Sequence, residues 1–487
     1  MAFRCKLLLL VILCVLCLSS VPVFAAEDNV PYQPNWESLR NYEAPEWWRD
    51  AKFGIYTHWG PYCVPAYRTE WYSCRMYQKG HPIYKYHVEH YGHPSEFGYK
   101  DFIPKFTAEN FDADAWADLF KRAGAQFAGP VAEHADGFAL WDSEHTRWDA
   151  AEMGPKRDVV GELARAIRKR DMKFVATLHH GWNWGWYPTW SEEFDCHKPE
   201  YRGLYGPHHP KDAPPNEQFF KGWLAKTVEV VDEYQPDVLW FDSKLGTIGA
   251  SYRQRFLAHF YNSAREWGRE VVVTYKNEDL PKGTAVLDIE RGSKSELTPY
   301  TWLTDTSVDR RSWCHIQDPD YKTVNTLIDS LVDRVSKNGN LLLNVGPKPD
   351  GTIPEPVRER LLGMGRWLDV NGEAIYGTRP WKIYGEGPTK IKGGMFGERK
   401  KVEFTAKDVR FTTREGNFYA ICLGWPGEEL KIDSLKSDAT PKEISRITML
   451  GAEGELEWSR GPDGLTVDMP KQKPCKHAFA LKIEWAE

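Results

Sequence analysis

The alternation of short β-rich runs with helical patterns constrains the fold more than any other feature of this sequence. From about residue 46 onwards, helical stretches such as "VVGELARAIRKR" and "VNTLIDSLVDRVSK" separate apolar runs of strand length. The strand-like runs are "KFGIYTHW", "QFAGPVAEH", "KFVATLHH", "VLWFD", "VVVTYKN", "AVLDIE" and "GNLLLNVGP". This order predicts parallel strands with crossover helices. Seven or eight such units in about 350 residues indicate an α/β fold, a (β/α)8 TIM-like barrel with enlarged loops.

The pattern of apolar and polar residues changes after "NGEAIYGTRPWKIYGEGP". Short alternating runs follow, punctuated by Gly and Pro turns, as in "KVEFTAKDVRFTTREGNFYAICLGW" and "HAFALKIEWAE". This pattern is typical of an all-β sandwich. We therefore expect a barrel domain over residues 27–384 and a C-terminal β-sandwich over residues 385–487.

The first 26 residues have the pattern of a cleaved secretory signal peptide. Arg4 and Lys6 precede an apolar stretch over residues 7–18, and small residues follow before a cleavage point near Ala25 or Ala26. The alternative, a membrane anchor, is disfavoured because a span needs about 20 apolar residues. No other segment is apolar enough to cross a bilayer. The sequence thus predicts a secreted or periplasmic protein without a membrane span.

The net charge of the chain is −6 at pH 7, and no long block of Lys and Arg is present. A nucleic-acid partner is therefore not expected, because phosphate binding needs a basic stripe.

Polar residues end most of the predicted strands. These residues are His58, His134, His179, His180, Asp242, Lys276 and Glu290. In a barrel of this kind the carboxyl ends of the strands share one mouth, where chemistry takes place. Asp242 and Glu290 lie on different predicted strands, and two carboxyl groups across a sugar suit glycoside hydrolysis. Spacing alone does not fix the distance between them.

Two other functions are compatible with polar strand ends. Histidines and carboxylates can bind a metal ion, but "YTHWG" has no second His two residues from His58, and His179 and His180 would point to opposite faces of a strand. We therefore predict no metal site. A non-catalytic sugar-binding protein with a Trp-rich mouth is the more distant alternative, and the two candidate carboxylates favour an enzyme.

Several ordered motifs resemble one known family. They are "WWRDAKFGIYTHWGPYCVPAY", "EWY", "EHADGFALWDSEHTRWDA", "KRDVVGEL", "VLWFDSKLG", "KNGNLLLNVGPKPDGTIP" and "NGEAIYGTRPW". Together they resemble glycoside hydrolase family 29, the α-L-fucosidases, over about residues 46–381. The C-terminal region is similar to that family's second domain.

The resemblance implies a retaining, exo-acting α-L-fucosidase without a cofactor. It makes Asp242, at the end of "LWFD", the nucleophile, and it places the acid/base in the segment that offers Glu290 and Glu296. We choose Glu290, which ends a predicted strand. The substrate implied is a fucosylated oligosaccharide or glycoconjugate, and a homo-oligomer is left open. Another retaining exoglycosidase, acting on a galactoside-like or modified fucoside substrate, is the nearest alternative.

The resemblance also assigns residues to sugar binding, with two departures. His58, Glu70, Trp71 and His134 match residues that bind fucose hydroxyls, and the rings of Trp71 and Trp313 would receive the C5 methyl group. The family often has a second histidine where this chain has Ala135, so one hydroxyl contact is either missing or supplied from elsewhere, by His179 or His180. The family also often has an Arg where Lys276 is the nearest cation, and Lys cannot form a bidentate fork.

Overall fold

The computed structural model describes residues 30–399, 402–438 and 442–486. The predicted signal peptide, residues 1–26, lies outside the described residues. In the part of the chain that is described, no helix is both long and apolar enough to cross a membrane.

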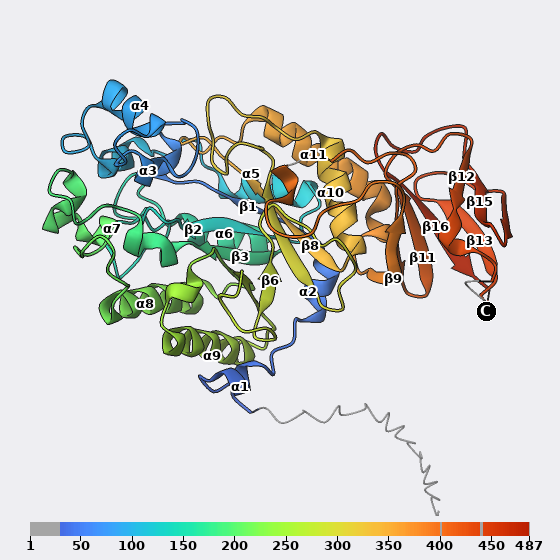
Figure 1. Cartoon of the computed structure of the whole chain (residues 1–487), viewed down its shortest axis with the longest axis horizontal. Coiled ribbons are helices and arrows are strands. Elements are labelled where there is room, and N and C mark those ends of the chain that lie inside the picture. Colours follow the sequence, from blue (N-terminus) through green and yellow to red (C-terminus); the bar gives the residue numbers. More distant parts are fainter. Residues whose placement is uncertain (1–29, 400–401, 439–441, 487) are drawn as a thin grey trace, which may run out of the picture. The chain divides into compact units, whose positions relative to one another are not determined.

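Eight parallel strands close into a barrel in the order β1 to β8, and β8 pairs with β1 (Figure 1). The strands are β1 Phe53–Thr57, β2 Phe127–Glu133, β3 Lys173–Leu178, β4 Val238–Phe241, β5 Val272–Lys276, β6 Val286–Asp288, β7 Trp302–Ser307 and β8 Gly339–Val345. One apolar cluster takes residues from every strand, including Tyr56, Val175, Trp240 and Leu342. The barrel interior is therefore packed largely with apolar side chains, and the charged groups described below lie toward its mouth. The predicted barrel is confirmed.

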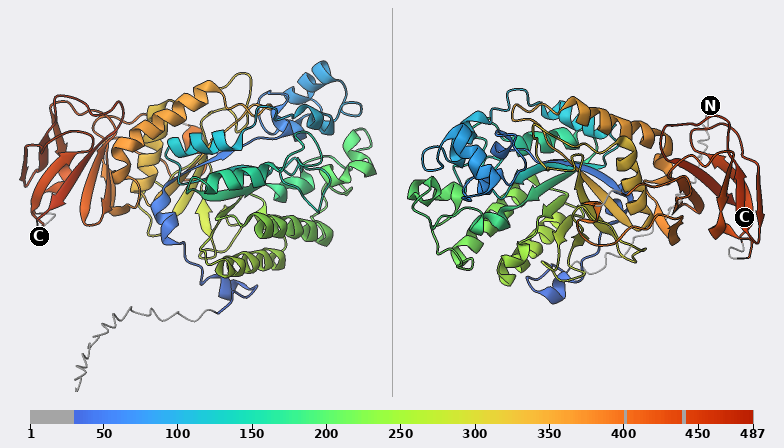
Figure 2. Two further views of the ribbon diagram at one scale, coloured as in Figure 1. Left: turned by 180° about the vertical axis from the view of Figure 1, so that it is seen from behind. Right: turned by 45° about the horizontal axis from the view of Figure 1, so that its top comes forward.

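Helices join most neighbouring strands. They are α5 Ala113–Arg122, α6 Val159–Arg168, α8 Glu217–Tyr234, α9 Ala250–Glu266 and α10 Val324–Ser336, and α11 Glu355–Asn371 follows β8. Several of these helices have a short polar residue at the N-cap. The Asp112 side chain accepts a hydrogen bond from the Ala115 N–H, and the Thr323 side chain accepts one from the Thr326 N–H. In Figures 1 and 2, α8 and α9 lie side by side against the barrel.

The β5–β6 and β6–β7 connections are loops. Residues 277–285 and 289–301, all of them described, contain no helix. The smaller helices are α1 Trp36–Leu39, α2 Glu46–Ala51, α3 Tyr72–Arg75, α4 Pro82–Tyr91 and α7 Arg202–Tyr205. Most of them lie in long connections near the barrel mouth, which are the enlarged loops predicted above.

Two antiparallel sheets form the C-terminal region. The larger has the order β13-β16-β11-β10-β9 and the smaller β12-β15-β14. Their strands are β9 Arg379–Glu386, β10 Val409–Arg414, β11 Asn417–Cys422, β12 Glu429–Ile432, β13 Ile444–Met449, β14 Trp458–Gly461, β15 Gly464–Asp468 and β16 Phe479–Trp485. Phe411 and Leu481 of one sheet share a core with Leu430 and Val467 of the other. The predicted sandwich is confirmed, and its first strand begins at Arg379, so the predicted boundary at 385 falls within β9.

The barrel and the sandwich are joined by buried polar contacts. The Arg410 guanidinium lies 2.8 Å from Asp333 Oδ1 on α10, and the Trp367 indole of α11 donates to the carbonyl oxygen of Ala478 at 2.7 Å. Both Arg410 and Asp333 are fully buried. A charge pair buried at this contact strongly disfavours separation of the two domains, since separation would leave each charge without its partner.

Candidate active site

The polar strand ends meet in one pocket of about 530 Å³ at the carboxyl ends of the barrel strands. Nine of the ten predicted site residues line it: His58, Glu70, Trp71, His134, His179, Asp242, Lys276, Glu290 and Trp313. Because these residues follow different parallel strands, only closure of the barrel brings them together.

His180 does not line this pocket, so its predicted placement was wrong. Its Nε2 atom lies 3.2 Å from the carbonyl oxygen of Trp223 and 3.1 Å from Thr227 Oγ1, both on α8. The reason is the alternation along β3: Val175 faces the barrel core, so His179 lies on the same face and His180 on the other. His179 therefore faces the pocket while His180 packs beneath α8. The alternative acid Glu296 is exposed and also lies outside the pocket.

Lys276 stands at the centre of the site. Its side chain is 1% exposed, and its Nζ atom lies 2.9 Å from Glu290 Oε2 and 3.2 Å from Asp242 Oδ1. Asp305 Oδ1 is 3.4 Å away and Asp288 Oδ2 is 4.0 Å away. Burial alone would lower the pKa of Lys276, but these four carboxyl groups raise it well above its usual value. The ammonium group is therefore charged at neutral pH.

Asp288 and Asp305 are site residues that the sequence analysis missed. The Trp240 indole donates to Asp288 Oδ2 at 2.9 Å, and the Tyr56 hydroxyl donates to Asp305 Oδ2 at 3.0 Å. Burial, together with the negative charge of Asp305, raises the pKa of Asp288 well above its usual value. These two carboxyl groups contact the Lys276 ammonium on its barrel-core side, where Tyr56 and Trp240 lie.

Asp242 receives a donor on each carboxylate oxygen. The Trp182 indole donates to Oδ2 at 2.8 Å, and Lys276 contacts Oδ1. These two donors fix the orientation of the carboxyl group, and a positioned carboxylate can act as a nucleophile. Trp182, in the 3-10 helix after β3, was not predicted as a site residue.

Glu290 differs from Asp242 in its surroundings. Burial raises the pKa of Glu290 to about 7, Lys276 opposes that rise, and the charges of Asp305 and Asp242 add to it. A carboxyl group with a pKa near neutrality can donate a proton and later take one back. The two carboxyl groups are therefore suited to different roles by their environments.

The distance between these carboxyl groups is limited by their shared partner. Since contacts of 3.2 and 2.9 Å join Asp242 Oδ1 and Glu290 Oε2 to the same nitrogen, the two oxygens are at most 6.1 Å apart. Inverting glycosidases separate their carboxyl groups by about 6.5–9.5 Å, whereas retaining ones have about 5–5.5 Å. The arrangement fits direct attack on a sugar better than attack by an intervening water.

Three histidines form one wall of the pocket. Nitrogen atoms of His58, His134 and His179 lie within 4.8 Å of one another, and among the described residues this is the group that could hold a metal ion. His58 Nδ1 is 2.8 Å from Asn344 Oδ1, whereas the Nδ1 atoms of His134 and His179 have no protein partner. Burial lowers the pKa of all three, that of His134 to about 4. Neutral imidazoles can also bind sugar hydroxyls, and the absence of a metal stays a prediction.

Beside the histidines, the pocket is lined by one buried carboxyl group and by aromatic rings, and the Trp313 ring lies 5.4 Å from that of His58. Glu70 Oε2 accepts from the Trp313 N–H at 3.1 Å and from the Ser312 hydroxyl at 3.3 Å. Burial raises the pKa of Glu70. The Trp71 ring packs against Trp182, with centroids 5.3 Å apart. Such a wall offers both a polar group for hydroxyls and apolar faces for a methyl group.

Comparison with known proteins identifies the family. The family model for α-L-fucosidase matches residues 20–373, and the model for the α-L-fucosidase C-terminal domain matches residues 402–484. The chain belongs to the α-L-fucosidase family. The tissue α-L-fucosidase of Mus musculus is 33% identical over 467 residues, which cover 93% of this chain and 94% of that protein. The plasma α-L-fucosidase of Homo sapiens is 33% identical over 478 residues, covering 94% and 93%.

A solved α-L-fucosidase has the same fold over almost the whole chain. The crystal structure of the Thermotoga maritima α-fucosidase in complex with fucose has a TM-score of 0.74 and 32% identity, and the match covers 93% of this chain and 100% of that one. The family, the fold class and the glycoside hydrolase activity predicted from the sequence are thereby confirmed.

Proposed function

We propose that this α-L-fucosidase uses Asp242 as its nucleophile and Glu290 as its acid/base in a retaining reaction. The observation that carries the proposal is the shared contact of both carboxyl groups with Lys276, which holds Asp242 Oδ1 and Glu290 Oε2 at most 6.1 Å apart. A related structure of the Thermotoga maritima enzyme, 32% identical, contains a mechanism-based inhibitor, which is consistent with a covalent route in the family.

In the first step, Glu290 donates its proton to the glycosidic oxygen while an Asp242 oxygen attacks the anomeric carbon. The bond between that carbon and the glycosidic oxygen breaks, the aglycone leaves as an alcohol, and a fucosyl ester of Asp242 remains. In the second step, Glu290 takes a proton from water, which attacks the same carbon and releases both fucose and Asp242.

The exchange of roles by Glu290 follows from its electrostatics. The charge of Asp242 is one of the factors that raise its pKa, and ester formation removes that charge. Lys276 then lowers the pKa of Glu290, and the charge of Asp242 no longer acts against it. Glu290 is thus protonated when an acid is needed and ionised when a base is needed.

The pocket walls suit one terminal fucosyl residue of an oligosaccharide or glycoconjugate. His58, His134, His179 and Glu70 would bind the ring hydroxyls, and the faces of Trp71 and Trp313 would receive the C5 methyl group. The packed barrel interior closes the pocket below these residues. A sugar chain can therefore enter only by its end, which supports exo action.

The proposal predicts the anomer released and the pH dependence of the wild type. Two successive inversions should release the α-anomer of fucose first, as followed by NMR before mutarotation. Because Glu290 must be protonated in the first step and its pKa is about 7, kcat/KM should fall as pH rises through about 7. Initial release of the β-anomer, or a profile flat to pH 9, would contradict the assigned roles.

We further propose that the chain is exported. Its support is the basic, apolar and small-residue pattern of residues 1–26 alone. The test is expression of the full sequence with the same chain begun at residue 27 as a control. Recovery of a shortened protein outside the cytoplasm from the full sequence only is expected, and an unprocessed cytoplasmic product would refute export.

A further inference from the structure

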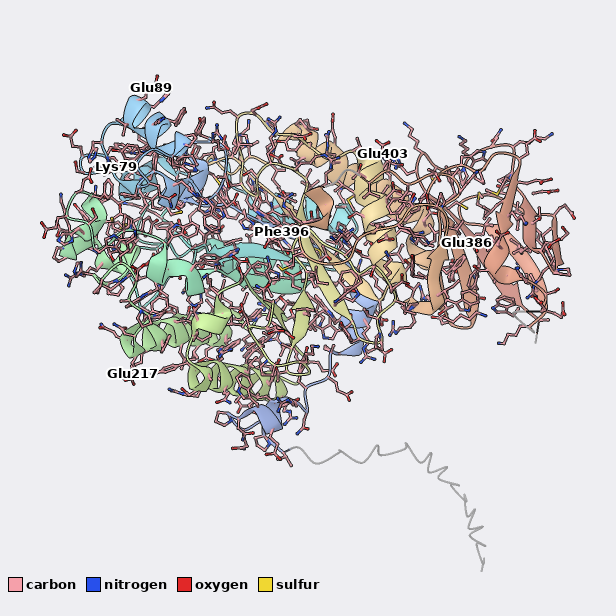
Figure 3. The ribbon with its side chains drawn as sticks, in the orientation of Figure 1. Lys79, Glu89, Glu217, Glu386, Phe396 and Glu403 are labelled. Atoms are coloured by element: carbon pink, nitrogen blue, oxygen red, sulfur yellow. The ribbon has the colours of Figure 1, made fainter. Side chains whose placement is uncertain are left out.

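The connection between β9 and β10 leaves the sandwich and reaches the barrel mouth. Phe396, in the middle of this connection, lines the active-site pocket. Figure 3 shows Phe396 over the barrel, whereas Glu386, at the end of β9, lies toward the C-terminal sheets. Residues 394–398 are called the strap below. They belong to neither sheet, so sheet pairing does not hold them in place.

The strap is bound along its length to the loop that carries Glu290. Gly394 N–H donates to the Ser293 carbonyl at 2.9 Å, and Glu398 N–H donates to the Arg291 carbonyl at 3.0 Å. Between them, Phe396 N–H donates to the carbonyl of Glu290 itself at 2.8 Å. Alternate strap residues thus follow the backbone of residues 290–293, and the sandwich domain touches the proposed acid/base directly.

A buried ion cluster fixes the end of the strap. Glu398 Oε2 lies 2.6 Å from Lys322 Nζ and accepts from the Thr306 hydroxyl at 2.6 Å, and Oε1 lies 2.7 Å from Arg334. Lys322 and Arg334 side chains are 3% and 4% exposed. Burial alone would raise the pKa of Glu398, but these cations lower it to about 2. The carboxylate therefore stays ionised and anchors the strap to the barrel.

Phe396 lies at the mouth of the pocket, not at its floor. Its surface is 36% exposed, whereas His58, His134 and His179 are at most 5% exposed. Its φ angle is +58°, in the left-handed region that non-glycine residues rarely adopt. The backbone bond to Glu290 and the Glu398 anchor hold it there. A strained, partly exposed aromatic residue beside a reacting group is a candidate for ligand contact.

We propose that Phe396 is a specificity residue that packs against the ring of the leaving group. The proposal rests on the role of Glu290 as the acid, since the group that protonates the glycosidic oxygen must lie beside the departing aglycone. The strap borders Glu290 on the open side of the pocket, so a pyranose or aryl ring attached to that oxygen meets the Phe396 face. The sandwich domain thereby takes part in the choice of aglycone.

The test compares three leaving groups in wild type and Phe396→Ala. The substrates are α-L-fucosyl fluoride, which has no leaving-group ring, 4-nitrophenyl α-L-fucoside and a fucosyl disaccharide. Loss of one ring contact should lower kcat/KM by about three- to tenfold for the two substrates with rings. Hydrolysis of the fluoride should change by less than about twofold, and Phe396→Tyr should keep wild-type rates because it keeps the ring.

Two results would overturn the proposal. Equal losses on all three substrates would mean that the strap only supports the fold. A loss on the disaccharide alone would mean that Phe396 positions Glu290 without touching the aglycone, because 4-nitrophenolate leaves with little help from an acid.

Val402→Ala is the matched control, since Val402 lies on the same connection, is also 36% exposed and does not line the pocket. Failure of the proposed acid role would instead appear as full activity of Glu290→Ala on the fucosyl disaccharide.

Discussion

Replacing Asp242 with glycine is expected to lower kcat/KM for 4-nitrophenyl α-L-fucoside by at least about 10⁴-fold, the scale seen when a covalent nucleophile is removed. Without this carboxylate no fucosyl ester can form. Sodium azide should restore turnover, because the space left by the side chain admits a small anion on the face that Asp242 attacked. A single inversion would then give β-L-fucosyl azide, which NMR distinguishes from the α-anomer.

The same variant should remain folded. Lys276 loses one partner but keeps Glu290, Asp305 and Asp288, so no charge is left buried alone. A thermal unfolding midpoint close to that of wild type is the control that separates lost chemistry from lost structure. A residual rate above 1% of wild type, or an azide product of α configuration, would remove Asp242 from the nucleophile role.

The strand ends could be predicted from the sequence because they depend on local pattern. Each run such as "VLWFD" combines a buried strand with the polar residue that follows it, and a barrel brings these ends together whatever their loops do. His180 was wrong although the alternation argued against it. Val175 of β3 faces the barrel core, so His179 lies on the same face, and His180 lies on the other face beneath α8.

Asp288 and Asp305 could have been found by carrying the same alternation further. Val286 and Leu303 face the barrel core, so the residues two positions later on β6 and β7, Asp288 and Asp305, point the same way. Two inward carboxyl groups on neighbouring strands require a buried cation nearby. Lys276, four positions after the inward Val272 on β5, supplies it. The lysine is thus as much a part of the barrel interior as of the substrate site.

No sequence pattern of this kind could have identified Phe396 as a site residue. It follows Glu290 by 106 positions and belongs to a connection within the sandwich. Nothing in "KGGMFGER" indicates that its backbone will bond to the loop at residues 290–293. That contact depends on how the two domains pack, and pair contacts across domains are not encoded in the local pattern of either one.

Replacing Glu290 with alanine is expected to produce a loss that depends on the leaving group. For a fucosyl disaccharide, kcat/KM should fall by about 10³–10⁴-fold, within the range of general acid catalysis. The loss should be much smaller for 4-nitrophenyl α-L-fucoside, because 4-nitrophenolate is stable without a proton. Azide should attack the fucosyl ester on the face vacated by the leaving group and give α-L-fucosyl azide.

The pH profile and a matched variant complete this prediction. The fall in kcat/KM above about pH 7 should disappear in Glu290→Ala, because that limb reflects the proton held by Glu290. Glu296→Ala is the control: the residue lies six positions later, is exposed and does not line the pocket, so rates within about twofold of wild type are expected. If Glu296→Ala instead lost activity while Glu290→Ala kept it, the acid would have to reach the glycosidic oxygen from outside the Lys276 cluster. The 6.1 Å limit between the two carboxyl oxygens would then no longer bear on the mechanism.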